Sequence, residues 1–246
     1  MNSNKFGLIG KNIGYSFSKS YFSNKFEKNG LKGYSYENFD IPNITEFLNI
    51  IEDNPELKGL NITIPYKESI IPFLDKLSKK AAQIGAVNTV GFTKKGELKG
   101  FNTDYYGFKK SIAPLLKPHH EKALILGTGG AAKAIAFALE ELDIEPIYVS
   151  RKTSTETLDY NQLDAKIFNE YHVIVNCTPI GTSPNTDACP EIPYDFFSPK
   201  HIAYDLIYNP QETTFLKKAK EKGAITKNGL EMLEIQADKA WEIWNR

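Results

Sequence analysis

The chain has 246 residues, 41% of them hydrophobic, and a formal net charge of +0 at pH 7. This length allows more than one average domain, and the balanced charge argues against a protein that binds nucleic acid by bulk electrostatic attraction. The sequence contains no apolar run long enough to span a membrane, and its N-terminus lacks the apolar core of a signal peptide. We therefore expect a cytoplasmic protein with neither a nucleic-acid nor a membrane partner.

Short strands and helices alternate in the N-terminal part of the chain. A helix is predicted after the serine-rich loop at 15–20, and Asn29-Gly30 is a typical end for it. A short amphipathic helix is predicted at 43–51. Strands are predicted at 5–10, 33–39 and 58–64, and a hairpin is predicted at 87–93 and 98–101, around the turn at 94–97.

Strands and helices alternate regularly from Lys122 onward. A helix at 104–116, interrupted at Pro114, precedes this region, and an amphipathic helix at 229–244 follows it. Strands are predicted at 123–126, 147–150, 173–176, 203–206 and 224–226. This pattern is typical of a parallel, doubly wound sheet. We predict an α/β fold with two domains, the nucleotide-binding one second, and a substrate cleft between them.

The cysteines and histidines do not form a metal-ligand pattern. Cys177 and Cys189 have the spacing of neither a zinc site nor a redox pair, which fits a reducing compartment. His119 and His120 follow Pro118 in a polar stretch, and we predict that they lie on an exposed loop. The sequence therefore predicts no metal site.

A glycine-rich turn joins the strand at 123–126 to an alanine-rich helix. Gly127 permits a tight turn, and Gly129 has no side chain to block a pyrophosphate. Gly130 and Ala131 allow close packing of the helix, whose N-terminal N–H groups favour an anion. Ala132 stands where a third glycine is common. The turn is a variant of the dinucleotide-binding fingerprint, and the alternative is an ordinary strand-to-helix turn.

The end of the next strand reads Ser150-Arg151-Lys152-Thr153. A site for NAD has an acidic residue here, which binds the ribose 2′-hydroxyl. Two cations and two hydroxyls suit a 2′-phosphate instead, so the sequence favours NADP over NAD. A solvated loop is the alternative interpretation of Arg151 and Lys152.

Polar side chains follow other predicted strands and loops. Ser16 and Ser18 alternate at a helix entry, where they can bind a carboxylate, although the spacing alone favours Ser18 as a helix N-cap. Asn61 and Thr63 share one face of a strand, and Lys67 lies just past its end. A lysine held in a cleft can exchange protons with a substrate oxygen, and the alternative is an exposed lysine at a helix start.

Two further polar segments, at 85–89 and 100–104, contain Asn88 and Asp104. An acid at Asp104 can pair with Lys67 and hold its charge and position. The alternative is that Asp104 caps the helix that begins there.

These segments, in this order, resemble the shikimate dehydrogenase family. The matching motifs lie at 16–18, 59–67, 85–89, 100–104, 127–131, 176–181, 204–210 and 228–237. They extend over essentially the whole chain. Each motif is weakly specific by itself, but their order along the chain is very specific.

The resemblance implies a fold and a reaction. The fold is an N-terminal α/β substrate domain over residues 1–104, a Rossmann-type domain for NADP(H) over 105–228, and a C-terminal helix at 229–246 that returns to the first domain. The reaction is the reversible NADP-dependent reduction of 3-dehydroshikimate to shikimate, on the route to chorismate and the aromatic amino acids. The expected partner is this small acid, and the expected assembly is a monomer or a homodimer.

The resemblance also assigns roles to individual residues. The catalytic pair would be Lys67 and Asp104. The substrate carboxylate would be bound by Ser16, Ser18 and Tyr208. The ring hydroxyls would be bound by Asn61, Thr63, Asn88 and Gln236. The pyrophosphate would be bound by Gly127, Gly129, Gly130 and Ala131. Thr178 and Pro179 would border the cofactor, and Gly229 would lie near the nicotinamide.

The chain departs from the family pattern at a few positions. Tyr15 and Lys19 replace a common histidine and proline beside the serines, and Ser150 replaces a common asparagine before Arg151. Three alternatives stay open at this point. They are a quinate/shikimate dehydrogenase that uses NAD, a sensor of a metabolite or nucleotide that has no catalytic activity, and another Rossmann dehydrogenase such as a folate-type enzyme.

Overall fold

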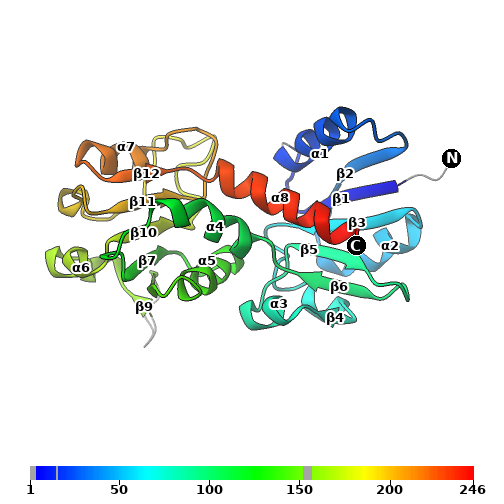
Figure 1. The fold of residues 1–246 in the computed structure, drawn as a ribbon, viewed down its shortest axis with the longest axis horizontal. Helices are drawn as coiled ribbons and strands as arrows, with labels where there is room; N and C mark the ends of the chain where they lie inside the picture. Colours follow the sequence, from blue (N-terminus) through cyan, green and yellow to red (C-terminus); the bar gives the residue numbers. More distant parts are fainter. Residues whose placement is uncertain (1–3, 15, 152–156) are drawn as a thin grey trace. The chain divides into compact units, whose positions relative to one another are not determined.

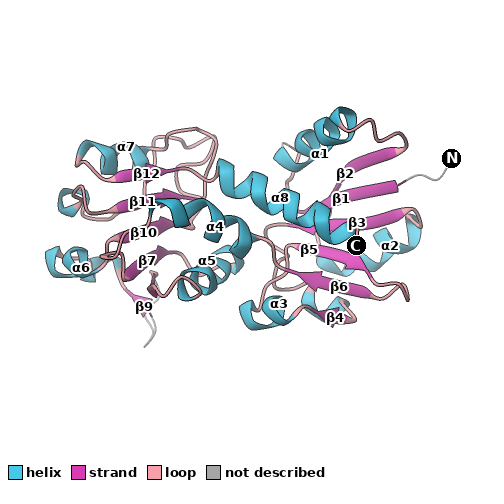
Figure 2. Ribbon diagram, in the orientation of Figure 1, coloured by secondary structure: helices cyan, strands magenta, loops and turns pink. Residues whose placement is uncertain are grey.

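The computed structural model describes residues 4–14, 16–151 and 157–246 (Figure 1). The chain divides into two compact units, Met1–Thr103 with Ala237–Arg246, and Asp104–Gln236. Within the described residues, each unit contains one six-stranded sheet with helices packed on it (Figure 2). The predicted α/β fold class is confirmed.

The first unit contains a mixed sheet. Its order is β2-β1-β3-β5-β6-β4, in which β2, β1 and β3 are parallel and β5 runs antiparallel to its two neighbours. The strands are β1 (Asn4–Gly10), β2 (Tyr34–Asp40), β3 (Leu57–Ile62), β4 (Lys76–Leu77), β5 (Thr89–Phe92) and β6 (Leu98–Phe101). The helices are α1 (Phe17–Lys28), α2 (Phe47–Asp53) and α3 (Lys79–Ile84). The predicted hairpin is confirmed as β5 and β6, whereas the two-residue strand β4 was not predicted.

Both faces of this sheet are covered. Phe6 and Leu8 point to one face, where they pack with Phe22 and Phe26 of α1. The same face receives Trp241 and Trp244 from α8 (Leu230–Trp244), which begins in the second unit and ends in the first. Ile9 points to the opposite face and packs with Phe47 of α2 and its neighbours. Alternate residues of β1 therefore serve two separate cores.

Close packing of α8 requires a glycine at Gly59. A Cβ added there would overlap the indole ring of Trp244. A Cβ added at Gly91, the partner of Gly59 in the β3–β5 ladder, would lie at an ordinary 3.7 Å from Ile243 and Trp244.

We predict that Gly59→Ala lowers the free energy of unfolding by about 1–3 kcal/mol, because overpacking forces the helix to shift. Gly91→Ala is the matched control, and we expect it to be neutral or to stabilise the protein by up to about 1 kcal/mol. Urea titrations of both variants measure the difference. Equal losses for the two variants would contradict the role given to Trp244.

The second unit contains an entirely parallel sheet in the order β12-β11-β10-β7-β8-β9. Its strands are β7 (Lys122–Leu126), β8 (Glu145–Val149), β9 (Thr157–Leu158), β10 (Val173–Asn176), β11 (Ile202–Asp205) and β12 (Ile225–Lys227). Its helices are α4 (Asp104–Ile112), α5 (Gly130–Glu140), α6 (Ala165–Glu170), α7 (Thr214–Glu221) and the first part of α8.

Helices cover both faces of the parallel sheet. Ala123 and Ile125 of β7 pack toward α4 and α5, whereas Leu124 and Leu126 pack toward α6 and α7. A strand that is buried on both faces has no polar alternation, which is the pattern that Lys122–Leu126 shows. The order of these strands brings the carboxyl ends of β7 and β10 together, beside the glycine-rich turn.

All four histidines belong to the second unit, near the amino ends of its strands. The rings of His119 and His120 lie 4.2 Å apart, and the ring of His172 lies 5.5 Å from that of His119 and 5.2 Å from that of His201. The prediction that His119 and His120 are exposed is wrong for His120, which is 4% exposed. Among the described residues, no group of His, Cys, Asp and Glu could hold a metal ion.

Two of these histidines accept a backbone hydrogen bond. Nδ1 of His120 accepts from the N–H of Lys117 at 2.9 Å, and Nδ1 of His201 accepts from the N–H of Ser198 at 3.0 Å. The other nitrogen of each ring lies within 3.0 Å of a carbonyl oxygen. Each ring must be neutral for this pattern, because a protonated Nδ1 cannot accept.

We predict that the protein loses stability as the pH falls below about 6.5, the usual pKa of histidine. Burial, together with the charges of the neighbouring histidines, lowers the pKa of His120 and His201 in the folded state. The unfolded chain therefore takes up protons first, which favours unfolding as the pH falls. The midpoint of thermal unfolding should be lower at about pH 5.5 than at about pH 7.5.

His201→Gln should reduce this pH difference, because glutamine can keep both hydrogen bonds without titrating. His119→Gln is the comparison, and we expect a smaller reduction, because His119 is exposed and lowers the pKa of the two buried histidines only through its charge. A pH difference that survives in His201→Gln and in His120→Gln would assign the effect to other groups.

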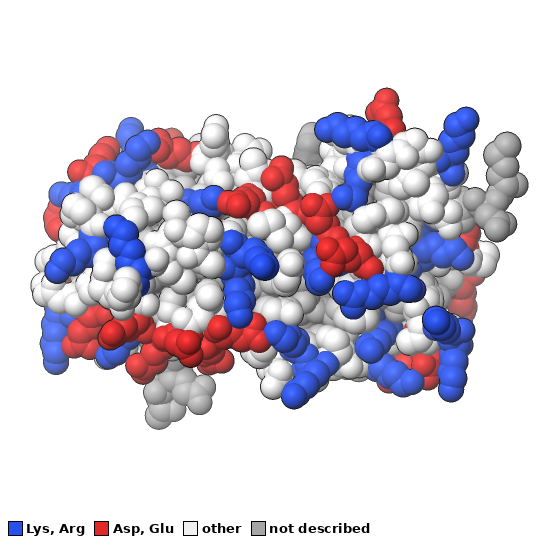
Figure 3. All heavy atoms as spheres, viewed as in Figure 1, with Lys and Arg blue, Asp and Glu red and all other residues white. Residues whose placement is uncertain are grey.

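The surface and the helices carry two further observations. Lys and Arg side chains are interspersed with Asp and Glu on the face shown in Figure 3. None of the helices in the described part of the chain has the length and apolar character that a membrane crossing requires.

Candidate active site

The loop after β1 is held against the end of β2. The Asp40 carboxylate accepts from the N–H groups of Asn12 and Ile13 at 2.9 and 3.2 Å, and Asn38 Nδ2 donates to the Ile13 carbonyl at 3.2 Å. These bonds fix the path of the chain toward Ser16, just before α1. Tyr15 lies outside the described residues.

The two predicted serines differ in role. Ser16 is the N-cap of α1, and its Oγ accepts from the N–H of Ser18 at 3.1 Å. The interpretation of Ser18 as the cap is therefore wrong, because Ser18 lies inside the first turn.

A buried polar network connects β3, β5 and the end of β6. Asn61 is 5% exposed and Asn88 is 3% exposed. Asn61 Nδ2 donates to the Asn88 carbonyl and to Thr89 Oγ1, both at 3.3 Å. Asn88 Oδ1 accepts from the N–H of Thr103 at 2.6 Å, and Asn88 Nδ2 donates to Thr103 Oγ1 at 2.9 Å. Buried amide groups need hydrogen-bond partners, so a site lined by them suits a polar ligand and not an apolar one.

Lys67 and Thr63 adjoin this network. The Lys67 carbonyl accepts from the N–H of Val87 at 2.7 Å, which places its backbone beside the residue that precedes Asn88. The N–H of Thr63 donates to the Ile9 carbonyl at 2.9 Å. Lys67 is half-buried and lies in a turn, so the alternative of an exposed lysine at a helix start is wrong.

Three predicted residues belong to the second unit. Asp104 is the first residue of α4 and is 6% exposed, and it directly follows Thr103, which is bonded to Asn88. Gln236 is 7% exposed, and its Nε2 donates to the Leu233 carbonyl at 3.0 Å. Tyr208 is half-buried, and burial raises the pKa of its hydroxyl. That hydroxyl therefore stays protonated and able to donate at neutral pH.

The glycine-rich turn has the backbone that an anion site needs. Gly127 has a φ of +103°, a conformation that favours glycine. Gly129 is the N-cap of α5 and supplies no side-chain cap, so the first N–H groups of the helix, at Gly130 and Ala131, have no partner within the helix. A Cβ at Gly129 would have no heavy atom within 4 Å, so packing does not require glycine there. Its missing side chain keeps these donors accessible, and the turn fits a dinucleotide pyrophosphate.

The end of β8 contains the residues expected at the ribose. The N–H of Ser150 donates to the Leu158 carbonyl of β9 at 2.9 Å. Arg151 is exposed, and its charge opposes the rise that burial causes in the pKa of Tyr160. No acidic residue stands at these two positions. Lys152, the third residue of this prediction, lies outside the described residues.

The segment after β10 is fixed by a buried acid that the sequence analysis missed. Asp205 is fully buried and accepts from Asn176 Nδ2 at 3.0 Å and from Thr213 Oγ1 at 2.6 Å. Burial raises the pKa of Asp205 to about 6. Asn176 Oδ1 accepts from the N–H and the Oγ1 of Thr178, at 3.0 and 2.6 Å. Thr178 and the exposed Pro179 are thus held just past the carboxyl end of the strand.

The surrounding backbone requires a glycine at Gly229. A Cβ at this position would collide with the carbonyl of Leu206, and the Gly229 N–H donates to the Ile207 carbonyl at 3.1 Å. Glycine is therefore required where the chain enters α8, whatever ligand lies nearby.

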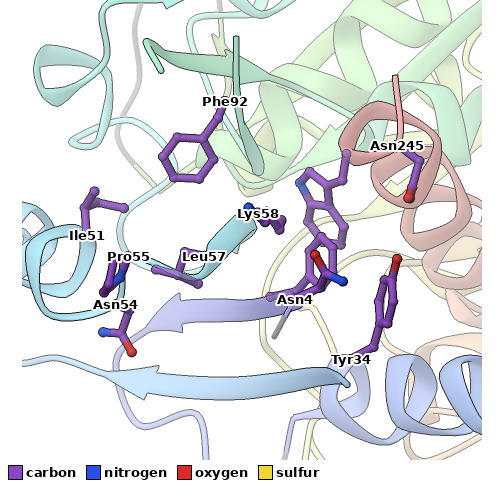
Figure 4. Close-up of a pocket in the computed structure, with 11 residues that line it drawn as sticks. Asn4, Tyr34, Ile51, Asn54, Pro55, Leu57, Lys58, Phe92 and Asn245 are labelled. Atoms are coloured by element: carbon purple, nitrogen blue, oxygen red, sulfur yellow. The ribbon is translucent and has the colours of Figure 1, made fainter. Parts of the chain in front are cut away.

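The first unit also has a pocket of about 420 Å³ at the amino ends of its parallel strands (Figure 4). Its lining includes Asn4 at the start of β1, Tyr34 at the start of β2 and Lys58 near the start of β3. Asn61 and Thr63, two predicted substrate residues of this unit, lie at the carboxyl end of β3. The pocket is therefore separate from the candidate active site.

The structure defines a dinucleotide-binding α/β protein with a polar site at the carboxyl ends of its strands. A family model described as the shikimate dehydrogenase substrate binding domain matches residues 8–90. A shikimate dehydrogenase (NADP(+)) of Clostridium botulinum is 40% identical over 249 residues, which cover 97% of this chain and 95% of that protein. The chain therefore belongs to the shikimate dehydrogenase family.

Two solved structures have a similar fold. One is shikimate 5-dehydrogenase from Thermus thermophilus in complex with NADP(H) and shikimate, at 33% identity and a TM-score of 0.86, covering 98% of this chain and 93% of that one. The other is quinate dehydrogenase from Corynebacterium glutamicum in complex with NAD, at 26% identity and the same TM-score, with the same shares of the two chains covered.

Proposed function

We propose that this chain catalyses the reversible NADP-dependent reduction of 3-dehydroshikimate to shikimate, in the biosynthesis of chorismate and the aromatic amino acids. The observation that carries the proposal is the amide network of Asn61 and Asn88, together with the position of Lys67. The Lys67 carbonyl accepts a hydrogen bond from Val87, which directly precedes Asn88. A polyhydroxylated ring needs several fixed amide and hydroxyl partners, and its reacting oxygen needs a proton donor.

The substrate residues divide by chemistry. Ser16, Ser18 and Tyr208 have hydroxyls, which can donate to a carboxylate. Asn61, Thr63, Asn88 and Gln236 have groups that can pair with ring hydroxyls. We assign the carboxylate to the first set and the hydroxyls to the second.

Lys67 supplies the proton. As the ketone is reduced, negative charge develops on its oxygen, and a cationic lysine stabilises that charge and then donates a proton to the new hydroxyl. Asp104 holds the charge and position of Lys67. In the reverse direction Lys67 takes the proton from the hydroxyl of shikimate.

NADPH supplies the hydride when it is bound. Gly127, Gly129, Gly130 and Ala131 would bind its pyrophosphate, and Ser150, Arg151 and Lys152 its 2′-phosphate. Thr178 and Pro179 would border the cofactor, and Gly229 would lie near its nicotinamide ring. The turn geometry supports a dinucleotide, and the absence of an acid at Ser150 and Arg151 favours NADP over NAD.

The remaining expectations concern the setting of the enzyme. The structure has no disulfide between Cys177 and Cys189, and we expect the enzyme to work in the reducing cytoplasm. Interspersed charges, as in Figure 3, favour a small-molecule partner over a nucleic acid. We expect a monomer or a homodimer, which sedimentation analysis would distinguish.

The direct test mixes the purified protein with shikimate and either NADP or NAD and follows the absorbance of the reduced nicotinamide. Rapid reduction of NADP by shikimate supports the proposal. A preference for quinate with NAD would instead assign the chain to the quinate enzymes. Binding of NADP and shikimate without any reduction would indicate a sensor and remove the catalytic role of Lys67.

A further inference from the structure

Tyr36 lies on the same sheet face as Asn61, one of the predicted substrate residues of the first unit. In the ladder order β2-β1-β3, Tyr36 pairs with Phe6, and Leu8 pairs with Asn61. Since Phe6 and Leu8 point to one face, Tyr36 and Asn61 point there as well. The Tyr36 ring stacks on Phe22 of α1 at 4.7 Å with an interplanar angle of 11°, so its direction across β1 is fixed.

The Tyr36 hydroxyl is bonded to the Asn61 amide. It donates to Asn61 Oδ1 at 2.7 Å. The other bonds of the Asn61 amide are longer, at 3.3 Å. Tyr36 therefore fixes the orientation of the Asn61 amide. Tyr36 is 3% exposed, and burial raises the pKa of its hydroxyl, which stays protonated at neutral pH.

We propose that Tyr36 is a positioning residue that holds the Asn61 amide in the orientation needed to bind a ring hydroxyl. This inference rests on the proposed function, because the contact at Asn61 takes its meaning from shikimate. Tyr36 acts through Asn61, and no direct contact with substrate is required of it.

The role follows from the partners of the Asn61 amide. Its Nδ2 donates to the Asn88 carbonyl and to Thr89 Oγ1, and its Oδ1 accepts from Tyr36. An amide oxygen has two acceptor sites. Tyr36 uses one of them and holds the amide in place, so the second site can accept from a ring hydroxyl of the ligand.

The test is Tyr36→Phe, which removes the hydroxyl and keeps the ring on Phe22. Shikimate binding is measured by calorimetry without nucleotide, and kcat and KM are measured with NADP. We expect the Kd and the KM for shikimate to rise about tenfold, as for loss of a partner in a buried network, with kcat and the KM for NADP within about threefold of wild type. Thermal unfolding confirms that the variant is folded.

Tyr66→Phe is the matched control. Tyr66 is 5% exposed in the same unit, and its hydroxyl donates to the Ile41 carbonyl at 2.7 Å on the opposite face of the sheet. It should leave the Kd for shikimate unchanged. An equal weakening in the two variants would overturn the proposal, because it would show a general effect of a lost buried hydroxyl.

A double-mutant cycle provides the second readout. In an Asn61→Ala background, the Tyr36 hydroxyl has no amide to orient, so the effect of Tyr36→Phe on the Kd should fall to about threefold or less. An undiminished tenfold effect would overturn this role. Wild-type protein that neither binds nor oxidises shikimate would remove the proposed function itself, whereas active wild type with an unaffected Tyr36→Phe variant removes only this inference.

Discussion

Lys67→Ala should lower kcat by about 10²–10⁴-fold, the range for loss of a general acid–base group. The Kd for shikimate should stay within about threefold of wild type, because Lys67 acts mainly on charge that develops in the transition state. Steady-state kinetics in the direction of shikimate oxidation, together with calorimetry, measure the two quantities. Turnover near wild type would show that Lys67 is not the proton donor.

A second variant of Lys67 separates proton transfer from charge, and a variant of another lysine serves as the control. Lys67→Arg keeps a cation but holds its proton too tightly to exchange it, so kcat should stay low. Lys58→Ala removes an exposed lysine near the other end of β3 and should leave kcat unchanged. A fully active Lys67→Arg variant would reduce the role of Lys67 to electrostatics.

Arg151→Ala should lower kcat/KM for NADP by about 10–100-fold, the effect of losing one or two charge-assisted hydrogen bonds to a phosphate. The value for NAD should change by less than about threefold, because NAD has no 2′-phosphate to lose. The measurement is kcat/KM for each nucleotide at saturating shikimate.

The control for this variant is Arg246→Ala, which removes the chain's other arginine, an exposed residue of the first unit. This variant should leave kcat/KM for NADP and for NAD unchanged. An equal loss for NADP and NAD in Arg151→Ala would show that Arg151 does not read the 2′-phosphate.

Much of the fold could be predicted because its signals are local. The run Lys122–Leu126 is apolar without alternation, and a strand buried on both faces requires that pattern. The glycine-rich turn after it was predicted at Gly127, where the backbone has a positive φ. The two-residue strands β4 and β9 were missed, because so few residues produce no periodicity.

Burial and pairing were less predictable, since they depend on residues distant in the chain. His120 follows polar residues in the sequence, yet the carbonyl of Lys200 covers it. Tyr36 carries no motif, and its bond to Asn61 exists only because β1 lies between β2 and β3 with a particular register. Ser18 was mistaken for a cap because Ser16, two residues earlier, has the same chemistry.

The path of α8 has a consequence for how the protein is made. The first unit needs Ala237, Trp241 and Trp244 to complete its core, although the rest of that unit ends at Thr103. The second unit is continuous from Asp104 to Gln236. Domains generally fold in order as a chain leaves the ribosome. Here that order is reversed, because the second unit is fully synthesised before the last helix turns arrive to close the first.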